Sequence, residues 1–120
     1  MFSKQAIVVS TAAGSGTKTA IKDITNTLLY WGVPSVVTYG VSVQAMNWSG
    51  VADKKKQKIE KETSKIVNKV LKKKRVKAGL KTKGLFMIMR MMQQKGWGSG
   101  EAEKIYWEQN GWLGKKRPWE

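Results

Sequence analysis

The chain has 120 residues, contains neither cysteine nor histidine, and carries 23 Lys and Arg against 8 Asp and Glu, a formal net charge of +15. This composition excludes a structural disulfide, a Cys/His zinc site, a catalytic thiol and a histidine general base. The apolar run near the start, Ala6 to Val9, is too short for a signal-peptide core or a membrane span. Together with the lack of cysteine, it predicts a cytoplasmic protein without a transmembrane segment.

The first predicted elements are a strand, a loop and a helix. Residues 5–10 form a continuous β-branched run, QAIVVS, which is typical of a strand buried on both faces. Small residues follow at 11–16, and Thr17 is the expected helix N-cap. Over 18–31 apolar residues recur at helical spacing and predict one buried stripe, formed by Ala20, Ile21, Ile24, Leu28 and Trp31.

A second strand is predicted at residues 35–43, SVVTYGVSV, because Gly32 and Pro34 end the preceding helix. A helix that connects two strands of one sheet places them parallel. The start of the chain is therefore predicted to be a βαβ unit of an α/β protein.

The rest of the chain is predicted to be helical and basic. Residues 53–95 hold sixteen Lys or Arg against three acids, so we separate a first segment, 1–52, from a carboxy-terminal extension, 53–120. We expect a helix over about 49–78 that ends at Gly79. Its apolar stripe is expected at Ile59, Thr63, Ile66, Val67 and Val70.

Two shorter helices and an irregular tail are expected to complete the extension. The first covers 80–95, and the second begins at Ser99 or Gly100 and runs to 108, with acidic residues near its positive end. The tail over 112–120 is expected to be anchored by tryptophans, namely Trp97, Trp107, Trp112 and Trp119.

Two parallel strands are too few for a stable sheet, since parallel sheets need both faces covered and usually contain more strands. No strand is predicted after Val43. We therefore expect the chain to be part of a larger α/β domain, completed either by another copy in a homo-oligomer or by a missing amino-terminal half. A self-sufficient α/β mini-fold is the alternative.

Three stretches carry a family resemblance: QAIVVSTAAGSG at 5–16, WGVP at 31–34 followed by VVTYGVSV at 36–43, and YWEQNGWLGKKRPW at 106–119. Taken together, they resemble the carboxy-terminal half of the flavodoxin-like NAD(P)H-dependent oxidoreductases, the family that includes NADPH-dependent FMN reductases. Residues 5–16 resemble the fourth strand of that fold and the loop after it. Residues 36–43 resemble the fifth strand, and residues 106–119 are similar to the tail of one subgroup.

The resemblance implies a five-stranded parallel sheet in the order 2-1-3-4-5, with FMN at the carboxyl ends of the strands. The intact family domain transfers electrons from NAD(P)H, its co-substrate, through FMN. This sequence supplies only the last two strands, and the family's phosphate loop has no counterpart in it. We therefore expect a fragment that binds FMN weakly or not at all and is not a competent enzyme alone.

The family's flavin-contacting loop, carried over residue by residue, is Thr11, Ala12, Ala13, Gly14, Ser15 and Gly16. Its small residues would let the backbone approach a flat ring closely. The N–H groups of such a loop could hydrogen-bond the pyrimidine edge of the flavin and stabilise the charge that gathers there on reduction. A tight strand-to-helix turn without a ligand is the alternative interpretation.

The basic stretch supports a function of another class, a helical binding module for polyanions, either nucleic acid or an anionic membrane. The cations available for this are concentrated at Lys54–Lys56 and Lys72–Arg75. Aromatic residues for base stacking are absent between Val51 and Leu85, so no specific nucleic-acid recognition is expected. A solvated helix face is the simpler interpretation.

Overall fold

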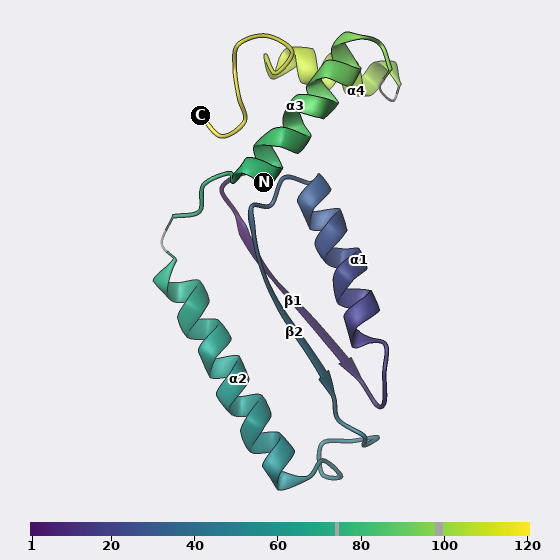
Figure 1. Cartoon of the computed structure of the whole chain (residues 1–120), viewed down its shortest axis with the longest axis vertical. Helices are drawn as coiled ribbons and strands as arrows, with labels where there is room; N and C mark the ends of the chain where they lie inside the picture. Colours follow the sequence, from purple (N-terminus) through teal and green to yellow (C-terminus); the bar gives the residue numbers. More distant parts are fainter. Residues whose placement is uncertain (74, 98–99) are drawn as a thin grey trace.

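A parallel βαβ unit followed by three helices forms this protein, as Figure 1 shows. The computed structural model describes residues 1–73, 75–97 and 100–120. In chain order the elements are β1 (Gln5–Ala12), α1 (Thr17–Tyr30), β2 (Ser35–Ser42), α2 (Asp53–Lys72), α3 (Leu80–Gln94) and α4 (Glu101–Gln109).

The two strands pair in parallel, in register from Gln5 opposite Ser35 to Ala12 opposite Ser42. The predicted pair of parallel strands joined by a helix is confirmed, and so is the mixed α/β class. The described part of the chain adds no third strand. Among the same residues, none of the helices combines the length and the apolarity that a bilayer crossing requires.

Helix α1 covers one face of the sheet and α2 lies on the other (Figure 1). Val8 is buried beneath α1, at 4% exposure. The approach is close because β2 carries glycine at position 40, where a Cβ atom would lie 2.9 Å from Cδ1 of Ile21. The predicted stripe of α1 is partly wrong: Ala20 is exposed and Ile24 and Trp31 are 46% and 58% exposed. Ile21 and Leu28 are half-buried, as the stripe requires.

The start of α1 also differs from the prediction. Gly16, with φ +100°, is the cap residue, and Thr17 is the first helical residue. The Thr17 side chain is turned toward the sheet, so that its Oγ1 would lie 3.1 Å from a Cβ atom at Gly40. Thr17 therefore packs against β2 and does not cap the helix.

The end of α1 is a Schellman motif, as Gly32 and Pro34 indicate. Gly32 takes φ +81°. Its N–H donates to the Leu29 carbonyl at 2.9 Å, and the Val33 N–H donates to the Leu28 carbonyl at 2.9 Å. Val33 is buried at 4% exposure. This turn sends the chain back antiparallel to α1, which allows β2 to run parallel to β1.

Helix α2 begins at Asp53, four residues later than predicted. The Asn47 side-chain oxygen accepts hydrogen bonds from the Ser49 hydroxyl at 2.8 Å and the Gly50 N–H at 3.0 Å. Val51 is then buried at 4% exposure. The local Asn-centred turn and the burial of Val51 keep this segment out of the helix.

Helix α2 also ends early, at Lys72 and not near Gly79. Beyond the helix, Val76 and Ala78 are buried. Their neighbours Arg75, Lys77 and Gly79 are exposed, so burial alternates along this segment. A helix continued through this segment would carry a dense run of like charges. The chain instead leaves the helix after Lys72 and buries Val76 and Ala78. Residue 74 of the predicted helix lies outside the described residues. Gly79 precedes α3 and so opens the next helix.

The third and fourth helices and the tail share a core of five aromatic rings. Neighbouring centroids in it lie 5.0–6.4 Å apart. We call this the aromatic cluster: Phe2, Phe86, Trp107, Trp112 and Trp119. The predicted tryptophan anchors are confirmed for three of the four residues, but Trp97 is 64% exposed and lies outside the aromatic cluster.

Arg90 fixes the tail onto α3. Its guanidinium donates to the carbonyl oxygens of Trp112 at 3.0 Å, Leu113 at 2.9 Å and Gly114 at 2.8 Å. The final helix begins at Glu101, after Gly100, and has Glu101 and Glu103 in its first turn as predicted. Ser99, the other predicted start, lies outside the described residues.

Candidate functional site

The predicted flavin-contacting loop lies at the carboxyl end of β1. Thr11 and Ala12 belong to the strand itself, so the loop is shorter than predicted and consists of 13–16. Backbone pairing continues beyond the carboxyl ends of β1 and β2. The Val43 N–H donates to the Ala12 carbonyl at 2.9 Å. The next N–H along the chain, that of Gln44, donates to the Ala13 carbonyl at 2.8 Å.

The loop backbone is open to solvent. Residues 13–16 are all exposed, and a Cβ atom built at Gly14 or Gly16 would meet nothing within 4 Å. The loop leads directly into α1, whose first N–H groups have no acceptor within the helix. The loop therefore exposes its residues to solvent, and no bulky side chain stands beside them.

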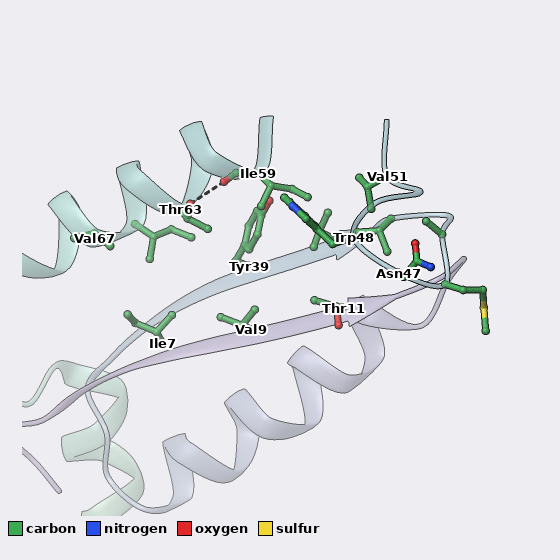
Figure 2. A pocket seen from close by; sticks show the side chains of 15 residues that line it. Ile7, Val9, Thr11, Tyr39, Asn47, Trp48, Val51, Ile59, Thr63 and Val67 are labelled. Carbon is green, nitrogen blue, oxygen red and sulfur yellow. Dashed lines mark hydrogen bonds between the residues drawn. The ribbon is translucent and has the colours of Figure 1, made fainter. Parts of the chain in front are cut away.

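An apolar hollow lies on the opposite side of the sheet from α1. Figure 2 shows Ile7, Val9 and Thr11 pointing from β1 toward α2. The hollow has a volume of about 540 Å³. Its walls are alternate residues of both strands, the inner stripe of α2 and the loop between them: Ile7, Val9, Thr11, Tyr39, Val41, Val43, Ala45, Met46, Asn47, Trp48, Val51, Ile59, Thr63, Ile66 and Val67.

This face of the sheet is only partly covered, so the prediction that residues 5–10 form a strand buried on both faces is wrong. Helix α2 contacts β2, whereas Ile7 and Val9 on β1 are 46% and 57% exposed. Tyr39 stands from β2 toward α2 in Figure 2. Burial raises the pKa of the Tyr39 phenol above its ordinary value, and repulsion from the Glu62 carboxylate adds to the shift. A phenol is already neutral at physiological pH with its ordinary pKa, so this shift leaves the protonation state of Tyr39 unchanged there.

Sequence reasoning identified part of this hollow. Four residues of the predicted stripe of α2, namely Ile59, Thr63, Ile66 and Val67, line the hollow, whereas Val70 does not. None of the residues of this helix is buried, and Val67 is 51% exposed, so the stripe is confirmed in direction and not in burial. Val51 was missed because a helix was expected from Ser49, and Trp48, just before that helix, was assigned to no element. The apolar residues that continue through the loop after the strand were the signal that could have located them.

No family model, curated protein or solved structure matches this chain. The class that the structure itself defines is an α/β protein with a two-stranded parallel sheet and a helix on each face.

Proposed function

We propose that this chain is the carboxy-terminal part of a flavodoxin-like domain that binds FMN and passes electrons from NAD(P)H through it. The observation that carries the proposal is the exposed, small-residue loop at the carboxyl end of β1, within a parallel βαβ unit. Open α/β sheets bind their ligands at this end of the strands. The family resemblance of residues 5–16 and 31–43 supports the same assignment.

FMN, when bound, would supply the redox chemistry, and this chain would position the ring. Gly14 and the alanines before it keep side chains out of the approach to the backbone. Backbone N–H groups of the loop would donate to the pyrimidine edge. The phosphate would be held by residues that this chain does not contribute, so the loop recognises the ring and not the phosphate.

The remaining strands would come from another polypeptide segment or from another copy of this chain. The outer edge of β1 has no neighbour among the described strands, and Ile7 and Val9 beside it are about half exposed. Unpaired edges and exposed apolar faces are normally covered in native proteins. The catalytically competent unit is therefore the completed sheet.

Titration with two flavins tests the loop assignment. We expect FMN and riboflavin to bind with similar, weak dissociation constants of about 1 mM or more, because the loop contacts only the ring they share. In a two-dimensional NMR titration of the ¹⁵N-labelled chain, riboflavin should shift the amide signals of 11–16. Shifts confined to other residues would contradict the proposal, and a tight one-to-one FMN complex would show that a phosphate anchor is present after all.

A matched pair of glycine variants controls this titration. Gly14→Val places a side chain where the ring would approach, and Gly84→Val places the same side chain on α3. A Cβ atom at either position meets nothing within 4 Å, so both variants should fold. We expect Gly14→Val to abolish the riboflavin shifts and Gly84→Val to retain them. Equal behaviour of the two variants would count against the loop as the ring contact.

Light scattering tests the completion of the sheet. We expect the purified chain to have a mass above the 13.5 kDa of one copy, and Val9→Asp to weaken self-association at least about tenfold, because an unpaired carboxylate would be buried. Leu80→Asp is the matched control, since Leu80 is 90% exposed and lies at the start of α3, outside the sheet. A single 13.5 kDa species that unfolds cooperatively would contradict the prediction.

A further inference from the structure

A second hollow lies at the amino end of the sheet, at the opposite end of β1 from the loop 13–16. Its volume is about 510 Å³. Four of its seven lining residues are cations and none is acidic: Ser3, Lys4, Gln5, Lys73, Arg75, Val76 and Lys77. We call it the basic hollow.

Two long-range hydrogen bonds bring the walls of the basic hollow together. The Gln5 side-chain amide donates to the Val70 carbonyl at 3.2 Å, which ties the start of β1 to the last turn of α2. The Lys73 ammonium donates to the Ser35 hydroxyl at 3.0 Å, which ties the end of the same helix to the start of β2. Lys4 and the cations after α2 therefore line one surface, although about seventy residues separate them in the chain.

Alternating burial directs the next two cations outward. Val76 and Ala78 are buried, at 9% and 8% exposure. Arg75, which precedes Val76, and Lys77, which lies between the two, are exposed. Val76 and Ala78 also line a small adjoining hollow together with Phe2. Apolar anchoring of every second residue thus presents a guanidinium and an ammonium to solvent side by side.

These cations are not neutralised within the described residues. The ion pairs found there join Lys56 to Asp53 and Lys65 to Glu62, both on α2. The carboxyl end of α2 attracts positive charge and accounts for cations in its last turn. Arg75 and Lys77 lie beyond the helix, so stabilisation of α2 does not explain them. An unpaired group of cations in a concave surface attracts a multiply charged anion.

An aromatic wall stands next to the basic hollow. The adjoining hollow, of about 280 Å³, shares Ser3, Val76 and Lys77 with it and is also lined by Trp119. The Trp119 ring is half-buried, and the Lys83 ammonium lies 5.6 Å from its centroid. The stretch from Val51 to Leu85 lacks aromatic residues in sequence, but the fold returns the tail to it and supplies one.

We propose that the basic hollow binds single-stranded nucleic acid without base-sequence preference. Backbone phosphates lie against Lys4, Arg75 and Lys77, and a base stacks beside Trp119. Cations along a groove next to an aromatic ring are the combination that single-strand binders use. A concave site with an adjoining aromatic hollow favours a flexible strand over the flat surface of an anionic membrane.

Fluorescence anisotropy with a labelled oligothymidylate of about twelve nucleotides tests this proposal over a series of salt concentrations. Each phosphate contact with a single strand contributes about −0.7 to the slope of log K against log salt. We expect the triple variant Lys4→Gln, Arg75→Gln, Lys77→Gln to make that slope less negative by about 2. The matched control is Lys54→Gln, Lys58→Gln, Lys61→Gln, which removes the same charge from the exposed face of α2 and should change the slope by less than about 0.7.

A tryptophan variant tests the stacking contact. We expect Trp119→Ala to weaken binding about fivefold to a hundredfold while leaving the salt slope unchanged. Because Trp119 belongs to the aromatic cluster, the thermal unfolding of the Trp119→Ala variant is first compared with that of the original chain. If the variant does not fold, the two triple variants decide the proposal alone.

Three results would overturn the proposal. Equal losses in the two triple variants would show diffuse attraction to the whole basic surface. Stronger binding to vesicles of anionic phospholipid than to the oligonucleotide would assign the hollow to a membrane. Full displacement of the oligonucleotide by micromolar pyrophosphate would assign it to a small phosphate ligand.

Discussion

Replacement of Phe86 by alanine should lower the free energy of unfolding by about 3 to 5 kcal/mol. Phe86 is the centre of the aromatic cluster: it is 4% exposed and its ring contacts those of all four other members. The stack on Trp107 has a centroid distance of 5.0 Å. Removal of the ring leaves a cavity among side chains that are held in place from three different segments, so the surroundings can relax only in part.

Urea unfolding followed by tryptophan fluorescence measures this loss, because three tryptophans lie in the cluster. Leu80→Ala is the control on the same helix: Leu80 is 90% exposed, and its loss should change stability by no more than about 0.5 kcal/mol. Similar effects of the two substitutions would mean that the cluster is not a packed core. The loss in Phe86→Ala should also free the Trp112 and Trp119 segment, which would raise its rate of amide hydrogen exchange.

Substitution of Gly32 by alanine should lower the free energy of unfolding by a comparable amount. The φ of +81° disfavours any side chain by about 1 to 2 kcal/mol. In addition, a Cβ atom would lie 2.6 Å from Cε1 of Phe2, and displacement of that ring from the aromatic cluster adds about 1 to 3 kcal/mol. The glycine therefore serves both the end of α1 and the contact between α1 and the cluster.

The control for Gly32→Ala is a substitution that should raise the free energy of unfolding. Gly84 lies inside α3, where a Cβ atom meets nothing within 4 Å, so Gly84→Ala should raise stability by about 0.5 to 1 kcal/mol. Thermal unfolding of both variants under one set of conditions measures the difference. Gly32→Ala with unchanged stability would contradict the close packing of Phe2 on this turn.

Most elements were predictable because their signals are local. Periodicity, turn residues and Pro34 located both strands and all four helices, with shifts at their ends. The ends of α2 were the largest errors, since they depend on burial of Val51 at one end and of Val76 and Ala78 at the other. Those residues are buried by partners distant in the chain, which local helical spacing does not include.

The candidate sites, too, were predictable only where their sequence signals are local. The loop at the end of β1 was predictable in position, and Thr11 and Ala12 belong to the strand because they pair with Val41 and Ser42 of β2. The α2 stripe of the apolar hollow was predicted from its spacing. The basic hollow was not, because Lys4 and Lys77 meet through contacts between the amino ends of the two strands and the end of α2.

The sequence by itself determined the α/β class, the parallel strands, the excess of cations and the absence of Cys and His chemistry. These properties follow from composition and from short-range patterns. The tertiary structure alone decided which of the many cations line one concave surface and that Trp119 stands beside them. Phe2 and Trp119 lie at opposite ends of the chain and contact each other at a centroid distance of 5.9 Å. Such a contact is driven by burial of aromatic surface from separate segments, and it leaves no periodic trace in the sequence.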